Sequence, residues 1–144
     1  MPVAVIDTNV LVARVSSRDA NHDAATAIVN AADHGNLPTM RVTNYVLTET
    51  LNYLHERKQH RVAVKFYERL TEAAGFELVH TPKTDFSTAV ELFERYDGLS
   101  FGDATIGAYM NREGLKHLYS FDDDFDVVDD ITRFETATNP FEPQ

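Results

Sequence analysis

The sequence begins with an apolar run that stops at a carboxylate, and this feature constrains the fold more than any other. Residues 3–6 are apolar, without polar alternation and rich in β-branched side chains, and Asp7 follows them directly. Such a run is typical of a strand buried on both faces, as in parallel sheets. We therefore expect Asp7 at the C-terminal end of a buried strand, where α/β sheets place their ligand sites. A carboxylate there is costly to desolvate, so it requires a cation or hydrogen-bond donors.

Size and composition limit the chain to one compact domain. With 144 residues, 43% of them hydrophobic, it can bury a single core but is short for two domains. It has no cysteine, which excludes disulfides, thiolate metal sites and a cysteine nucleophile. No stretch resembles a signal peptide or reaches the roughly 20 apolar residues of a membrane span, so we expect a cytoplasmic protein.

The net charge argues against a generally basic, nucleic-acid-binding surface. The chain carries 23 acidic and 13 basic residues, a formal charge of −10, and only four of the basic residues are lysine. Nucleic-acid-binding surfaces are usually basic, so a contact with RNA would need local positive charge or a metal ion. An acidic, lysine-poor surface also favours solubility in concentrated salt. A halophilic source and an ordinary acidic protein therefore stand as equal alternatives.

The hydrophobic pattern predicts strands that alternate with helices. Helices are expected at residues 8–15, 20–32, 44–57, 61–74, 84–96 and 100–112, and further strands at residues 39–43, 76–80, 118–121 and 131–134. The helix at residues 84–96 places Phe86, Val90 and Phe93 on one side. Strands separated by helices imply parallel pairing through crossovers. The predicted fold is therefore an α/β sandwich rather than an all-α bundle.

Two of the predicted strands end in acids that would face each other. Asp7 follows the first strand, and Asp122 follows the strand at residues 118–121. If these strands are parallel neighbours, both carboxylates lie at the same edge of the sheet. Asp103 lies in the first turn of the helix that leads into the later strand. Its carboxylate would repel the other two unless a metal ion neutralised them.

Each of the later acids also has an ordinary explanation. Asp103 could cap its own helix by reaching back to Ser100, and Asp122 begins an acidic triplet that could be a solvated turn. A fourth candidate, Glu49, lies on a largely apolar helix, opposite its leucine face. That position predicts a partly enclosed carboxylate, although a surface glutamate is the commoner case.

Several other acid-rich or phosphate-binding motifs do not fit. The haloacid dehalogenase motif needs a second aspartate where the chain has Asn9. An EF-hand over residues 122–133 would need glycine at Val127 and glutamate at Arg133. The sequence contains no glycine-rich phosphate loop and no zinc-protease histidine spacing. A response-regulator receiver needs a lysine near its last strand, whereas Lys116 precedes its strand.

Four motifs, in order along the chain, resemble those of the PIN-domain nucleases. They are Asp7-Thr8-Asn9 after the first strand, Glu49 on a central helix, Asp103-Ala104 opening a late helix, and the segment 120–125 after a late strand. The resemblance extends from about Val3 to Phe134. The size and the single-domain build are similar to those of the VapC-type toxins of toxin-antitoxin pairs.

The resemblance implies a fold, an activity and partners. The fold would be a three-layer sandwich, with a central, mostly parallel sheet and helices on both faces, formed by residues 1–135 and followed by a tail at 136–144. The activity would be that of a Mg²⁺- or Mn²⁺-dependent endoribonuclease that hydrolyses RNA. The protein would be a homodimer held inactive by a small antitoxin protein. Alternatives are a catalytically inert PIN-like scaffold and an RNA-processing nuclease outside a toxin-antitoxin pair.

The resemblance also assigns site residues. It places four carboxylates in one catalytic and metal-binding site: Asp7, Glu49, Asp103 and Asp122. The first and third would be the principal direct ligands, and Asp124 or Asp126 could take the place of the last. Thr8, Asn9 and Ser120 would orient carboxylates or water. Hard oxygen ligands independently suit Mg²⁺ or Mn²⁺, and either one or two ions could bind.

One short region concentrates positive charge. Five of the 13 basic residues lie between positions 57 and 69, namely Arg57, Lys58, Arg61, Lys65 and Arg69. A continuous helix would align them as one stripe, whereas a break near residues 59–60 would split it. The stripe could contact the RNA backbone or the antitoxin. It could equally be a solvated face balanced by the nearby glutamates at positions 56, 68 and 72.

Overall fold

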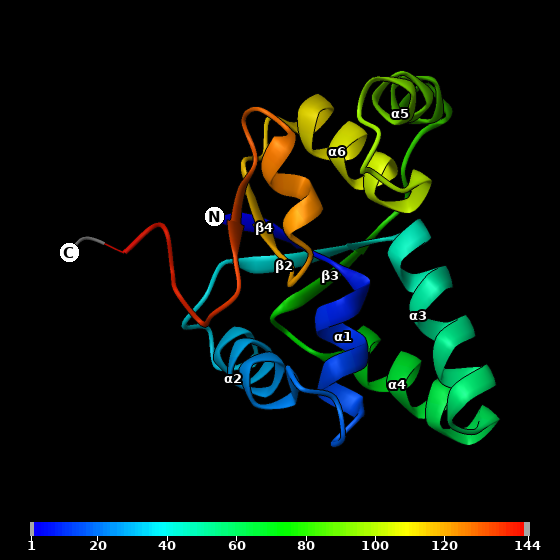
Figure 1. The fold of residues 1–144 in the computed structure, drawn as a ribbon. Helices are drawn as coiled ribbons and strands as arrows, with labels where there is room; N and C mark the ends of the chain where they lie inside the picture. Colours follow the sequence, from blue (N-terminus) through cyan, green and yellow to red (C-terminus); the bar gives the residue numbers. More distant parts are fainter. Residues whose placement is uncertain (1, 143–144) are drawn as a thin grey trace.

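A computed structural model describes residues 2–142, and Figure 1 shows their arrangement. One five-stranded, all-parallel sheet has the strand order β3-β2-β1-β4-β5. The strands are β1 (Val3–Ile6), β2 (Thr39–Thr43), β3 (Phe76–Val79), β4 (His117–Tyr119) and β5 (Thr132–Phe134). The α-helices within the described residues are α1 (Thr8–Val15), α2 (His22–Asp33), α3 (Asn44–Arg57), α4 (His60–Glu72), α5 (Lys83–Arg95) and α6 (Phe101–Glu113). A 3-10 helix, η1 (Asp123–Val127), follows β4. The predicted α/β fold is confirmed.

The first strand lies at the centre of the sheet. Ala4, Val5 and Ile6 are all fully buried, as the unbroken apolar run predicts. β1 pairs in parallel with β2 on one side and with β4 on the other. The strands that precede Asp7 and Asp122 are therefore neighbours, and the two acids lie at the same edge of the sheet.

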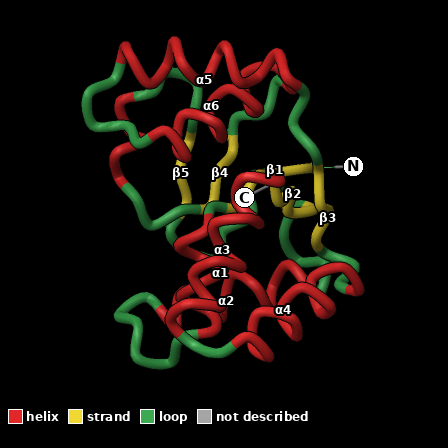
Figure 2. The backbone as a smooth tube through the Cα atoms, turned by 90° about the vertical axis from the view of Figure 1, so that its right-hand side faces the viewer, coloured by secondary structure: helices red, strands yellow, loops and turns green. Residues whose placement is uncertain are grey.

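Helices cover both faces of the sheet. Figure 2 shows α5 and α6 on one side of the strands and α1 to α4 on the other, which gives the three layers of the predicted sandwich. α6 is buried from Ala104 through Met110. It ends at Gly114, whose φ of 69° lies in the left-handed region that glycine adopts most easily. None of the described helices is long and apolar enough to cross a membrane.

The strand before Asp122 is shorter than predicted. β4 ends at Tyr119 instead of continuing to Phe121: the Ser120 amide still donates to the Phe134 carbonyl at 3.1 Å, but side chains accept the two amides that follow. The Phe121 amide donates to Asn9 Oδ1 at 3.2 Å, and the Asp122 amide donates to Ser120 Oγ at 3.0 Å. The chain therefore leaves the sheet early and carries Asp122 into the loop that begins η1.

The break between α3 and α4 and the orientation of α5 determine which basic and aromatic side chains lie at the surface. α3 ends at Arg57 and α4 begins at His60, so the basic stripe is split in two. On α5 the buried positions are Asp85 and Ala89, whereas its two phenylalanines are only partly covered, with ring centroids 5.3 and 5.6 Å from that of Phe101 on α6. Phe86 is 49% exposed and Phe93 is 47% exposed.

The residues after β5 contact the domain. Tyr119 donates a hydrogen bond to the Thr138 carbonyl, and Asn139 Nδ2 donates to the Asn36 carbonyl at 3.0 Å. The ring of Phe141 lies 4.9 Å from that of His117. These contacts hold part of the segment that the sequence indicated as a tail.

Candidate active site

An acid-lined pocket lies at the edge of the sheet where β1 and β4 end. Its volume is about 460 Å³, and its walls come from the β1–α1 turn, α3, the start of α6 and the segment after β4. The carboxylates that line it are Asp7, Asp19, Glu49, Asp103, Asp122 and Asp124. Among the lining residues in the described part of the chain there is no arginine or lysine. The four acids predicted from the motifs are thus brought together, with no cationic side chain among them.

Asp7 is the most tightly held of these acids. It is 5% exposed, and its Oδ1 accepts the Thr8 amide at 2.8 Å, which makes Asp7 the N-cap of α1. Its Oδ2 accepts a hydrogen bond from Ser120 Oγ at 2.7 Å. Burial raises the pKa of Asp7 to about 6, even though both hydrogen bonds act in the opposite direction. A cation nearby would offset the cost of keeping this carboxylate charged.

Ser120 and Asn9 join the β1–α1 turn to the loop after β4. The buried Ser120 hydroxyl, besides donating to Asp7, accepts Asn9 Nδ2 at 3.3 Å and the Asp122 amide at 3.0 Å. Asn9 Oδ1 in turn accepts the Phe121 amide at 3.2 Å. This network links the backbone of Asp122 to the Asp7 carboxylate and fixes their relative positions.

Glu49 stands at the open rim of the pocket. Its side chain is exposed, so the expectation of partial enclosure is wrong. The apolar face of α3 packs inward, and the opposite side meets the mouth of the pocket instead of another helix. Thr8 Oγ1 donates to Glu49 Oε2 at 2.9 Å and orients the carboxylate. The start of α6 passes close by, since a Cβ on Gly102 would lie 3.6 Å from Glu49 Oε1.

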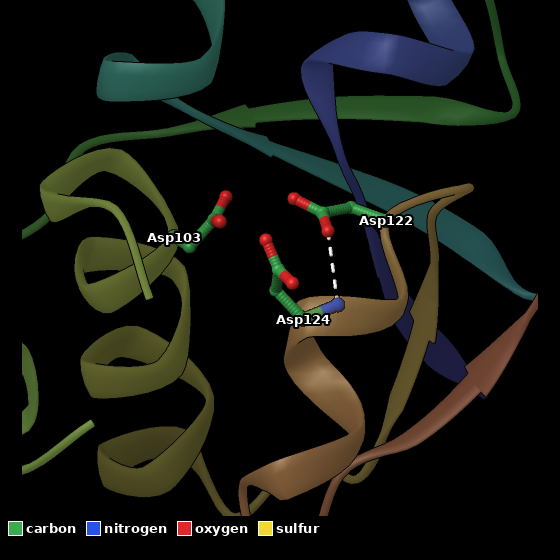
Figure 3. A group of neighbouring side chains, drawn as sticks. All are labelled: Asp103, Asp122 and Asp124. Atoms are coloured by element: carbon green, nitrogen blue, oxygen red, sulfur yellow. Dashed lines mark hydrogen bonds between the residues drawn. The ribbon is translucent and has the colours of Figure 1, made fainter. Parts of the chain in front are cut away.

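Three aspartates on the other side of the pocket form a compact cluster. One carboxylate oxygen from each of Asp103, Asp122 and Asp124 lies within 4.8 Å of the others, as Figure 3 shows. The Ser100 hydroxyl caps α6 by accepting the Asp103 amide at 3.1 Å, and the Asp103 carboxylate extends toward the two other aspartates. Asp122 Oδ1 accepts the Asp124 amide at 2.9 Å. Ser100 therefore caps α6, while the Asp103 carboxylate belongs to the aspartate cluster.

Repulsion between carboxylates contributes to the raised pKa values of Asp103 and Asp124. Burial and then the charges of Asp7 and Asp122 raise the pKa of Asp103 to about 7. The charge of Asp122 is the main cause that raises the pKa of Asp124. Oxygens bound to one Mg²⁺ at about 2.1 Å lie at most roughly 4.2 Å apart, so the cluster would need to close only slightly around an ion. The donor set therefore fits a hard divalent cation, and it could hold Mg²⁺ or Mn²⁺.

The structure distinguishes the three candidates for the last acid of the site. Asp122 and Asp124 both line the pocket. Asp126 instead accepts hydrogen bonds from Arg133 Nε and Nη2 at 2.9 and 3.1 Å. These bonds lower the pKa of Asp126, whose charge is neutralised outside the pocket. Asp122 and Asp124 therefore line the same pocket, whereas Asp126 pairs with Arg133.

Asp19 and Tyr53 are among the pocket residues that were not identified from the sequence. Asp19 lies in the loop after α1, where its Oδ1 accepts the Asn21 amide at 2.8 Å, and no motif marks that loop. Tyr53 lies on α3, four residues after Glu49. Residues at that spacing share one face of a helix, so the position of Glu49 could have indicated Tyr53.

Comparison with known proteins agrees with the fold and the acid-lined pocket. The PIN domain family model matches residues 4–131, and the chain belongs to the PIN-domain family. Within that family it is a homologue of VapC ribonucleases. It is 32% identical over 127 residues to a VapC ribonuclease from Archaeoglobus fulgidus, in a match that covers 86% of this chain and 80% of that protein. It is also 32% identical over 126 residues to the 23S rRNA-specific endonuclease VapC20 from Mycobacterium tuberculosis, covering 85% and 92% of the two chains.

Solved structures share the fold. The crystal structure of Mycobacterium tuberculosis VapC20, described as a sarcin-ricin loop cleaving toxin, matches with a TM-score of 0.75 and 28% identity, covering 88% of this chain and 95% of that one. VapBC2 from Rickettsia felis, bound to a DNA fragment from its promoter, matches with a TM-score of 0.69 and 12% identity, covering 92% and 97%. A toxin-antitoxin complex from Klebsiella pneumoniae matches with a TM-score of 0.64 and 19% identity, covering 94% and 98%. Several similar structures are thus complexes of a toxin with its antitoxin.

Proposed function

We propose that this protein is a Mg²⁺- or Mn²⁺-dependent endoribonuclease that hydrolyses RNA phosphodiester bonds in the acid-lined pocket. One observation carries the proposal: six carboxylates converge there, and no arginine or lysine is among the described lining residues. Repelling carboxylates cost stability unless a cation binds them, and a phosphate substrate can approach them only once their charge is offset. The relatives with similar sequences are named as ribonucleases.

The proposed catalytic and metal-binding residues are the four predicted acids, Asp7, Glu49, Asp103 and Asp122. We propose Asp7 and Asp103 as the principal ligands, as the family resemblance implies, and both carboxylates line the same pocket. A bound Mg²⁺ or Mn²⁺ supplies an activated water and neutralises charge on the phosphate. Asp124 adds a further oxygen beside Asp122.

The chain's own residues position these carboxylates. Ser120 and the Thr8 amide hold the Asp7 carboxylate in one orientation, so that it need not reorganise during the reaction. Glu49, oriented by the Thr8 hydroxyl at the rim, is placed to align a water molecule or to accept its proton. Asn9 keeps the loop that carries Asp122 against α1.

A cleavage assay tests the proposal. Purified protein incubated with ribosomal RNA should cut it when Mn²⁺ or Mg²⁺ is present and should not cut it in excess EDTA. Ribosomal RNA is the first choice because one relative is named as specific for 23S rRNA. If neither ribosomal nor total cellular RNA is cut with Mn²⁺ present, the proposed activity is wrong.

We further propose that the protein is the toxin of a toxin-antitoxin pair, acting in the cytoplasm as a homodimer inhibited by a small antitoxin. Similar structures are toxin-antitoxin complexes, which supports an antitoxin partner. The exposed Phe86 and Phe93 on α5 support self-association, since exposed aromatic patches are typical of interfaces. Light scattering should give twice the 16.2 kDa chain mass. If no inhibitory partner is co-encoded, the RNA-processing alternative is favoured.

A further inference from the structure

We propose that Tyr53 stacks on a base of the bound RNA strand and that Arg57 pairs with a phosphate next to that base. The proposal rests on the proposed function, which makes RNA the substrate. Both residues lie on α3, beyond Glu49 along the helix. They give the acid-lined pocket a part that binds the nucleotide, in addition to the carboxylates that bind the metal ion.

The lining of the pocket includes an aromatic and an aliphatic side chain. These are Tyr53 on α3 and Val12 on α1. Each lies four residues after a polar residue of the pocket, Glu49 on α3 and Thr8 on α1, and therefore on the same face of its helix. Figure 1 shows the two helices side by side. At about 1.5 Å per residue, four residues of a helix rise roughly 6 Å, a length comparable to the distance from a phosphate to the base of the same nucleotide.

Tyr53 has a ring face that a base can cover. The residue is 36% exposed, and its ring lines the pocket instead of packing in the core. The guanidinium of Arg57 lies over the ring, with Cζ 5.7 Å from the ring centroid. This cation–π contact favours one position of the ring and leaves the opposite face for a ligand. Every nucleobase can stack on such a face, whatever its identity.

Arg57 has a positive charge that the fold leaves unpaired. Its side chain is exposed, and it forms no ion pair with any residue that the structure describes. A free guanidinium next to a site for a phosphate diester is well suited to a second phosphate of the same strand. Glu49, Tyr53 and Arg57 thus present a carboxylate, a ring and a cation in order along one face of α3. This order suits the cleaved phosphate with its metal ion, then a base, then the next phosphate.

Exposure alone does not distinguish Tyr53 from other surface aromatics. Tyr67 on α4 is 42% exposed, but it is not among the residues that line the acid-lined pocket. Single exposed aromatic side chains are ordinary on protein surfaces. Tyr53 differs because it lines the pocket that holds the carboxylates and has a cation over its ring. Tyr67 therefore provides a matched control.

Binding of two short, fluorescently labelled oligonucleotides tests the proposal. One is a single-stranded RNA, and the other has the same ribose-phosphate backbone without bases. Anisotropy is measured with Ca²⁺, which supplies a hard divalent cation for the carboxylates, and a gel checks that the RNA stays intact. The wild-type protein should bind the RNA at least about fivefold more tightly than the abasic chain, as expected for one base stack. Tyr53→Leu should abolish this preference and leave binding of the abasic chain unchanged.

Three further variants separate the base contact from the phosphate contact. Tyr53→Phe keeps the ring and should keep the preference for the RNA with bases. Arg57→Gln should weaken binding of both oligonucleotides to the same degree, and should reduce the slope of the salt dependence by about one. Tyr67→Leu should bind both like wild type. All three side chains are exposed, so these variants should fold, which circular dichroism checks.

Three results would overturn the proposal. The first is a wild-type protein that does not bind the RNA, or binds it no more tightly than the abasic chain. The second is a Tyr53→Leu variant that loses affinity for both oligonucleotides equally, which would indicate a structural role. The third is the same loss in Tyr67→Leu as in Tyr53→Leu. Because binding is measured without cleavage, a protein that shows the preference but cuts no RNA contradicts the proposed activity alone.

Discussion

The two ends of α6 carry two clusters of charged side chains that are built in opposite ways. At its C-terminal end lies the paired cluster of Arg41, Glu77, Asp85, Arg112 and Glu113. There Arg112 Nε lies 2.6 Å from Asp85 Oδ1, and Arg41 Nη1 lies 3.0 Å from Glu113 Oε1. At its N-terminal end Asp103 faces further acids, with no arginine or lysine among the described residues of the pocket.

The pKa shifts have opposite meanings at the two ends. Hydrogen bonding to Asp85 raises the pKa of Arg112, so the fold favours the charged form of that side chain. Burial raises the pKa values of Asp7 and Asp103, so the fold disfavours their charged forms. The charges of the paired cluster are neutralised within the fold, whereas the described lining of the acid-lined pocket offers no cationic side chain, which supports the proposed binding of a divalent cation.

The largest expected effect is on cleavage. Asp7→Asn and Asp103→Asn should each lower the rate of RNA cleavage by at least about 100-fold, because each removes a charge that holds the metal ion. Initial rates with Mn²⁺ measure this. Asp85→Asn, in the paired cluster, should retain cleavage in the fraction that folds. Equal losses in all three variants would remove the functional distinction between the clusters.

The paired cluster should dominate stability instead. Asp85→Ala should lower the free energy of unfolding by about 2 kcal/mol, since it leaves Arg112 without its buried partner. Arg112 is 38% exposed at its side chain, which keeps the effect below that of a fully buried pair. Urea unfolding measures the difference. If the free energy of unfolding fell no more than for a typical surface substitution, the pair of Asp85 and Arg112 would not stabilise the fold as we infer.

The pH dependence of stability should also distinguish the acid-lined pocket from the paired cluster. A carboxyl whose pKa is higher in the folded state than in the unfolded chain stabilises the fold when it is protonated, below about pH 4. That contribution is lost as the pH rises through about 6 for Asp7 and about 7 for Asp103. In EDTA the melting temperature should therefore fall between about pH 5 and pH 8.

Asp103→Asn serves as the control for that pH effect. Because Asp103 is partly exposed, the variant should gain only about 1 kcal/mol over wild type at about pH 8 in EDTA. Its melting temperature should also fall less as the pH rises. If the melting temperature of the variant fell with pH as much as that of wild type, ionisation of Asp103 would not destabilise the metal-free protein.

The smallest effect is expected at a neutralised acid close to the pocket. Asp126→Asn removes an exposed ion pair with Arg133, and should cost less than about 1 kcal/mol in stability. Its cleavage rate should match that of wild type. A loss of cleavage comparable to that of Asp7→Asn would place Asp126 in the site and overturn the division between neutralised and unneutralised acids.

Much of the fold could be predicted because its signals are local. The apolar run at residues 3–6 predicts a central buried strand, and Gly114 ends α6 where the pattern indicates. The end of β4 could not be predicted, because it depends on a hydrogen bond from the Phe121 amide to Asn9, which is distant in sequence. The solvent-facing side of α5 is also a tertiary property, since periodicity alone does not reveal which side of a helix is covered.

The site residues also divide into those with a local sequence signal and those that depend on tertiary structure. Asp7, Asp103 and Asp122 could be predicted because each follows a strand or opens a helix, and topology then brings them to one edge. The exposure of Glu49 and the inclusion of Asp19 depend on how α3 and the loop after α1 border the pocket. No local pattern encodes such a border.

Calorimetric titration of the metal-free protein with Mn²⁺ tests the central claim most directly. We expect wild type to bind Mn²⁺ and to gain melting temperature as its concentration rises. Asp103→Asn should bind at least about tenfold more weakly, whereas Asp85→Asn should bind like wild type. Absence of binding heat and of any thermal shift in folded wild-type protein would contradict the conclusion that the acid-lined pocket is completed by a divalent cation.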